Sequence, residues 1–128
     1  MIMKRILIVE DEKRMRQIYA RLLKDLGFNV LEASGAQEVI PILLSEFIDL
    51  VLLDINIPVF GGQEIFDALR EYDPKLKVIV CSVYSVDKQK SVVPKADDYF
   101  DKSQESSILL DKIYRALSLT REVHSAAR

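Results

Sequence analysis

The chain has 128 residues, of which 49% are hydrophobic and 30% are charged, and its formal net charge is −2. This length predicts one soluble domain that buries about two-thirds of the surface its unfolded chain would expose. The charge balance argues against nucleic acid or an anionic membrane as a direct partner, because both require a basic surface. No apolar stretch approaches the roughly 18 residues of a membrane span. The single cysteine predicts a reduced, cytoplasmic protein without disulfides.

Four short apolar runs have the character of buried strands, and each ends in polar residues. In chain order they are Ile6–Val9 followed by Glu10, Asp11 and Glu12; Ile48–Leu53 followed by Asp54; Val78–Cys81 followed by Ser82; and Tyr99–Asp101 followed by Lys102. If these strands are parallel, their ends meet at one edge of the sheet, where α/β proteins bind their ligands. Carboxylates, a hydroxyl and an ammonium group at one edge predict a site that handles phosphoryl groups.

Helical patterns alternate with the strands. Apolar residues recur at helical spacing between Met15 and Leu26, and Gly27 is the expected C-terminal cap of this first helix. A short strand over 28–31 follows it. Ser34–Gln37 has the spacing of a capping box for a second helix, which Pro41 should kink or start later.

The second half of the chain continues the alternation. A third helix is expected between Ile65 and Tyr72, and Asp73–Pro74 should end it. Pro94 interrupts the next helical segment, so the fourth helix should be short or irregular. The last helix places Leu109 and Ile113 on one face. This alternation predicts an α/β fold with three layers, in which helices cover both faces of a parallel sheet.

Four motifs, taken in order, resemble the receiver domain of two-component response regulators, the CheY-like family. They are ILIVEDE at 6–12, LLDINIP at 52–58 with glycines at 61 and 62, VIVCS at 78–82, and ADDYFDK at 96–102. The resemblance implies a flavodoxin-like (βα)5 fold whose five-stranded parallel sheet has the strand order 2-1-3-4-5. It also implies a receiver domain over residues 1–120, followed by a C-terminal tail over 121–128.

The resemblance implies a signalling role rather than an enzymatic one. Asp54 would accept a phosphoryl group from a sensor histidine kinase or a histidine phosphotransfer protein. Lys102 and the Ser82 hydroxyl would bind phosphoryl oxygens and so assist the transfer. Ser82 and Tyr99 would then move together and reshape a partner-binding face formed by the fourth helix, the fifth strand and the fifth helix. The downstream partner is not specified by the sequence.

Mg²⁺ is the cofactor that the resemblance implies. Its ligands would be the carboxylates of Asp11 and Asp54 and the main-chain carbonyl of Asn56, with Glu10 reaching the ion directly or through water. Oxygen ligands of this kind suit a hard cation that keeps several of its own waters. The ion would also relieve the repulsion among three neighbouring acids.

Some features depart from the family pattern. Ser103 stands where the family usually has proline after the lysine, so the Lys102–Ser103 bond is either trans, with Lys102 less rigidly aimed, or a strained cis bond.

Glu10 and Asp11 could also be charges that favour the start of the first helix. Tyr99 could be a plain strand residue, half-buried against the last helix.

Two other functions are compatible with the sequence. A degenerate receiver would bind its partner without being phosphorylated. The second alternative is a hydrolase that forms an aspartyl-phosphate intermediate. It is considered because Asp54-Ile-Asn56 resembles the start of haloacid-dehalogenase motifs. That family has a second aspartate where Asn56 stands.

Overall fold

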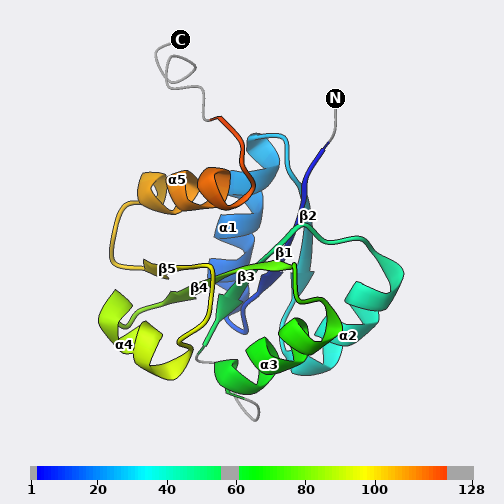
Figure 1. The fold of residues 1–128 in the computed structure, drawn as a ribbon. Coiled ribbons are helices and arrows are strands. Elements are labelled where there is room, and N and C mark those ends of the chain that lie inside the picture. Colours follow the sequence, from blue (N-terminus) through cyan, green and yellow to red (C-terminus); the bar gives the residue numbers. More distant parts are fainter. Residues whose placement is uncertain (1–2, 56–60, 121–128) are drawn as a thin grey trace.

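The computed structural model describes residues 3–55 and 61–120, in which strands and helices alternate (Figure 1). The strands are β1 (Arg5–Val9), β2 (Asn29–Ala33), β3 (Leu50–Asp54), β4 (Lys77–Ser82) and β5 (Asp98–Asp101). The helices are α1 (Lys13–Asp25), α2 (Ala36–Ser45), α3 (Gly62–Tyr72), α4 (Val86–Val92) and α5 (Ser106–Ala116). All paired strands are parallel, and their order is β2-β1-β3-β4-β5. The predicted flavodoxin-like fold is confirmed.

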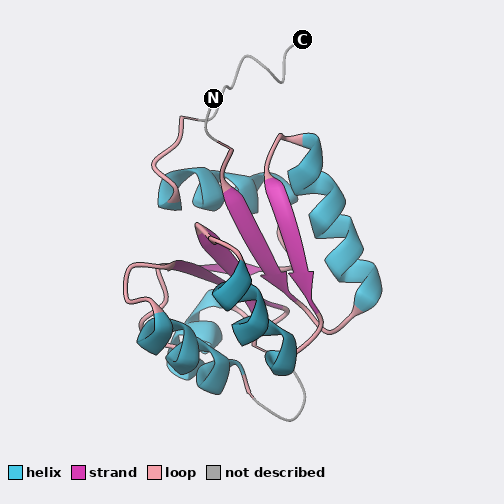
Figure 2. Ribbon diagram, turned by 90° about the vertical axis from the view of Figure 1, so that its right-hand side faces the viewer, coloured by secondary structure: helices cyan, strands magenta, loops and turns pink. Residues whose placement is uncertain are grey.

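The sheet is the middle of three layers. Helices α1 and α5 cover one face, and α2, α3 and α4 cover the other (Figures 1 and 2). Every residue of β3 is buried, because this central strand has a neighbour on each side and helices on both faces. Its near-continuous apolar sequence follows from that position. No helix among the described residues has the length and apolar character needed to cross a bilayer.

The ends of the helices largely follow the sequence signals. Gly27 has a φ of +96°, the left-handed conformation that glycine supplies after a helix, and α1 ends two residues before it. The main chain of Ile55 leaves no room for a side chain at Gly62, because a Cβ there would lie 2.5 Å from the Ile55 Cα. The start of α3 therefore packs directly on the residue that follows Asp54.

The expected cap of α2 is wrong. Gly35 is the N-cap, and the Ser34 N–H and hydroxyl both donate to the Glu38 carboxylate, so the expected capping box with Gln37 does not form. The reason is that α2 begins at Ala36, which places Glu38 rather than Gln37 at the third helical position. Of the two effects expected of Pro41, a kink or a later start, the later start does not occur, because α2 begins at Ala36 and Pro41 lies exposed inside it.

Helix α4 is short, as expected. It has seven residues, and the Ser85 hydroxyl caps it by accepting a hydrogen bond from the Lys88 N–H at 3.3 Å. Helix α3 ends at Tyr72, directly before Asp73 and Pro74, again as the sequence indicates.

Candidate functional site

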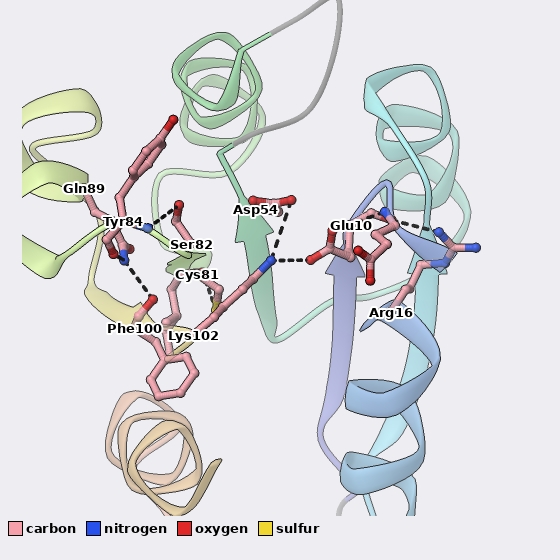
Figure 3. Close-up of polar contacts among 11 residues, drawn as sticks. Glu10, Arg16, Asp54, Cys81, Ser82, Tyr84, Gln89, Phe100 and Lys102 are labelled. Carbon is pink, nitrogen blue, oxygen red and sulfur yellow. Dashed lines mark hydrogen bonds and ion pairs between the residues drawn. The ribbon is translucent and has the colours of Figure 1, made fainter. Parts of the chain in front are cut away.

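The polar residues at the strand ends gather at one edge of the sheet. Asp54 is the last residue of β3 and Ser82 the last of β4, while Glu10 and Lys102 directly follow β1 and β5. The register pairs Asp54 with Cys81 and Ser82 with Asp101 on neighbouring strands. Figure 3 shows the Lys102 side chain reaching from β5 across β4 toward Asp54 and Glu10. The parallel topology thus brings together residues up to 92 positions apart in the chain.

A buried lysine joins two buried carboxylates at this edge. Lys102 Nζ lies 2.5 Å from Glu10 Oε1 and 3.7 Å from Asp54 Oδ2. The exposed fraction of the side chain is 8% for Lys102 and 5% for each acid. Because water screens these charges little, the ammonium group offsets a repulsion that would otherwise keep two carboxylates apart.

The pKa values of the pair reflect burial and this contact. Burial raises the pKa of Glu10, and the hydrogen bond from Lys102 counteracts part of that effect. Burial would lower the pKa of Lys102, but its bond to Glu10 and the charge of Asp54 outweigh burial and raise it. The lysine is therefore protonated at neutral pH and available to bind another anion.

Three carboxylates form a cluster suited to a metal ion. Oxygen atoms of Glu10, Asp11 and Asp54 all lie within 4.8 Å of one another. Glu10 and Asp54 are buried and Asp11 is exposed, so the cluster opens to solvent on one side. An all-oxygen, anionic set of ligands fits Mg²⁺ or Ca²⁺ rather than a soft metal. Asn56, the fourth expected ligand, lies outside the described residues.

Arg16 anchors the main chain of Glu10, a contact that sequence reasoning missed. Its Nη1 donates to the Glu10 carbonyl at 2.8 Å, and its Nε donates to Glu32 Oε1 at 3.2 Å. Arg16 thus joins the end of β1 to β2 from helix α1. Nothing in the sequence distinguishes this arginine from Arg14 and Arg21 on the same helix.

Ser82 is completely buried and tied to the neighbouring loop and strand. Its Oγ accepts a hydrogen bond from the Tyr84 N–H at 3.2 Å, and its carbonyl accepts one from the Lys102 N–H at 2.8 Å. The hydroxyl proton of Ser82 is not used by the Tyr84 bond. Ser82 and Lys102 are therefore held as one unit at the ends of β4 and β5.

Tyr99 points away from the last helix, so the expected half-buried position against that helix is wrong. Only 5% of Tyr99 is exposed, and its ring packs in the core between the sheet and helices α2, α3 and α4. Its hydroxyl donates to the Val93 carbonyl and accepts a hydrogen bond from the Ala96 N–H at 3.1 Å. The alternation of a strand explains this, because the next residue, Phe100, faces α5.

The peptide bond between Lys102 and Ser103 is trans, since the described residues contain no cis peptide bond. The turn after Lys102 is held by Asp101, whose Oδ1 accepts hydrogen bonds from the Ser103 N–H at 2.9 Å and the Ser103 hydroxyl at 2.7 Å. Serine at this position thus supplies a polar contact of its own where a proline ring would be expected.

Gln89 of α4 is a second residue that sequence reasoning missed. It is completely buried, and its Nε2 donates to the carbonyls of Tyr84 and Phe100, both at 2.8 Å. These bonds join the β4–α4 loop to β5, next to Ser82 and Lys102. A glutamine between two lysines in a short helix gives no sequence signal of burial.

Comparisons with known proteins identify the family and the fold. The model of the response regulator receiver domain family matches residues 6–114. A receiver domain protein (CheY-like) from Methanospirillum hungatei is 29% identical, with a TM-score of 0.84 over 91% of this chain and 95% of that one. The response regulator TrrA from Thermotoga maritima, solved in complex with Mg²⁺-BeF, is 31% identical, with a TM-score of 0.82 over 90% of this chain and 100% of that one.

A curated relative is much longer than this chain. A cyclic di-GMP phosphodiesterase from Thermotoga maritima is 33% identical over 114 residues, which cover 88% of this chain and 30% of that protein. The shared part is thus less than a third of that protein. The family match spans all of these strand ends from β1 to β5. The chain therefore belongs to the response regulator receiver domain family of two-component systems.

Proposed function

We propose that this chain is a phosphoacceptor that takes a phosphoryl group on Asp54 from a histidine kinase or a histidine phosphotransfer protein. The observation that carries the proposal is the arrangement around the Asp54 carboxylate. It ends the central strand, lies 3.7 Å from the Lys102 ammonium group, and shares a cluster of acids with Glu10 and Asp11. This arrangement combines a nucleophilic oxygen with charges that can stabilise a phosphoryl group.

Phosphoryl transfer would convert Asp54 into an acyl phosphate. A carboxylate oxygen attacks phosphorus, the bond from phosphorus to the donor nitrogen breaks, and that nitrogen keeps the bonding electron pair, so that the donor imidazole leaves as a neutral ring whose other nitrogen already carries a proton. Lys102 supplies positive charge for a phosphoryl oxygen, and the Ser82 hydroxyl can donate to another. Positioning and charge neutralisation account for most of the catalysis of such a transfer, so no further acid or base is required.

The acid cluster would hold Mg²⁺ through Asp11 and Asp54, with Glu10 bound directly or through water and the Asn56 carbonyl as a further ligand. When bound, Mg²⁺ would neutralise the carboxylates and the incoming phosphoryl oxygens. Glu10 is already bonded to Lys102 at 2.5 Å, which leaves the exposed Asp11 more available to the ion.

The output of phosphorylation would be a changed surface for a protein partner. We propose that Ser82 and Tyr99 respond to the phosphoryl group and that the face of α4, β5 and α5 carries the signal. Tyr99 is suited to this, because its hydroxyl is bonded to the segment that follows α4. The receiver unit would span residues 1–120 and act in the cytoplasm, without direct contact to nucleic acid or membrane.

Incubation with acetyl phosphate tests the proposal and separates it from the alternatives. The protein should gain one phosphoryl mass in Mg²⁺ and none in EDTA, and hydroxylamine should remove it. A degenerate receiver would gain no mass. A hydrolase would turn over p-nitrophenyl phosphate many times, whereas a phosphoacceptor should not.

A further inference from the structure

Gln89 is a completely buried, uncharged polar residue behind the strand ends of the site. It lies in α4, where its neighbours Lys88 and Lys90 are exposed. Its amide points inward, between the β4–α4 loop and the end of β5 (Figure 3). A buried amide is unfavourable unless its hydrogen bonds are made, so the contacts of this side chain explain its place.

The two hydrogen bonds of Gln89 fix the orientation of its amide. Nε2 donates to the carbonyls of Tyr84 and Phe100, both at 2.8 Å. Within the described part of the chain, the buried Oε1 accepts no hydrogen bond. A flipped amide would bring its oxygen against two carbonyl oxygens, so Nε2 must face them. The side chain thus donates one hydrogen bond to the β4–α4 loop and one to β5.

These contacts lead through Tyr84 to the Ser82 hydroxyl. Gln89 holds the Tyr84 carbonyl, while the Tyr84 N–H donates to Ser82 Oγ at 3.2 Å. Ser82 Oγ is thereby engaged as an acceptor on the loop side, and its own proton remains for a bond elsewhere. On β5, the Phe100 carbonyl is two residues before Lys102, whose N–H donates to the Ser82 carbonyl at 2.8 Å.

We infer that Gln89 is a positioning residue that orders the β4–α4 loop and thereby directs the Ser82 hydroxyl toward the anion bound at Asp54. The inference rests on the proposed phosphoacceptor function. Gln89 makes no contact with the anion and acts through Ser82. Its contribution is preorganisation, because a hydroxyl whose orientation is already set loses less freedom when the anion binds.

Beryllofluoride, a mimic of the phosphoryl group, is the probe. Its affinity in Mg²⁺ should fall about three- to tenfold in Gln89→Met, which keeps the length of the side chain and removes its donor. The affinity for Mg²⁺ alone should change less than about twofold, because Gln89 touches none of the acids. Val39→Ala, a destabilising change at a buried residue of α2, is the control and should leave beryllofluoride affinity unchanged.

A double-mutant cycle with Ser82→Ala decides whether Gln89 acts through Ser82. The effect of Gln89→Met should shrink below about twofold in the Ser82→Ala background, because coupled residues are not additive. Equal effects in both backgrounds, or an unchanged affinity in Gln89→Met, would overturn the inference.

Hydrogen exchange gives a readout that does not depend on phosphorylation. The Tyr84 amide should exchange at least about threefold faster in Gln89→Met than in Val39→Ala, because loss of the Gln89 bond frees the loop. Wild-type protein that binds no beryllofluoride would refute the proposed function, and with it the role toward the anion. Unchanged Tyr84 exchange would refute the ordering of the loop by Gln89, whatever the function.

Discussion

Replacing Lys102 with methionine removes the ammonium group and keeps most of the apolar stem. The variant leaves Glu10 and Asp54 buried, close together and without the cation 2.5 Å and 3.7 Å away. Breaking a buried ion pair by removing one partner costs about 3–5 kcal/mol, because the remaining charge is still desolvated. We therefore expect the free energy of unfolding at pH 7 to fall by about that amount without Mg²⁺.

Added Mg²⁺ and a lower pH should each reduce the loss of stability in Lys102→Met. A cation bound by the acids replaces the missing positive charge, so Mg²⁺ should stabilise Lys102→Met more than wild type. Burial already raises the pKa of Glu10, and loss of Lys102 removes a contact that lowers it. A carboxyl group with a raised pKa binds protons more tightly in the folded state, so stability rises as pH falls. The gap between variant and wild type should be smaller at pH 5 than at pH 7.

Urea unfolding with and without Mg²⁺, at both pH values, measures these effects. Lys112→Met is the matched control, because Lys112 pairs with Asp98 at 3.1 Å with both side chains at least one-fifth exposed. A partly exposed pair of this kind contributes about 1 kcal/mol or less. The electrostatic account of the site is refuted if Lys102→Met is no less stable than Lys112→Met, or if Mg²⁺ stabilises all three proteins equally.

Three further outcomes are expected. Asp11→Ala should weaken Mg²⁺ binding, measured by calorimetry, more than Glu10→Ala does, because the Glu10 carboxylate already forms an ion pair with Lys102. A larger effect of Glu10→Ala would contradict this. Burial raises the pKa of the Cys81 thiol to about 12, so a disulfide reagent at pH 8 should label only the urea-unfolded protein. Rapid labelling of the native protein would contradict the burial of this thiol. Tyr99→Phe should lower the free energy of unfolding by about 1 kcal/mol while acetyl phosphate labelling continues; loss of labelling would show that the hydroxyl is needed for transfer.

The gathering of polar residues at one edge of the sheet could be predicted from the sequence, because burial and topology leave few alternatives. A charged residue directly after an apolar strand must lie at the end of that strand, and parallel strands align their ends. Asp54 and Lys102 follow from this rule without any knowledge of side-chain contacts. Gly27 and the short α4 are also local signals, and the structure agrees with both.

The positions that depend on one-residue details could not be predicted in the same way. Ser34 bonds Glu38 because the helix starts one residue later than its capping pattern suggested. Tyr99 faces the α4 side of the sheet. The sequence does not show this, because the fifth strand is too short for its alternation to reveal which residues face which side. Gln89 resembles a surface residue in sequence, and only the tertiary fold shows the two carbonyls that its amide reaches.

The location of the phosphoryl group is the most direct test of the account. After labelling with acetyl phosphate and Mg²⁺, borohydride reduction converts an aspartyl phosphate to homoserine, which peptide mass spectrometry locates. We expect homoserine at position 54 alone, no labelling of Asp54→Asn, and normal labelling of Asp49→Asn. The Asp49 carboxylate lies at the other end of β3 and accepts the Arg5 N–H at 2.8 Å. A phosphoryl group on another residue, or undiminished labelling of Asp54→Asn, would contradict this expectation.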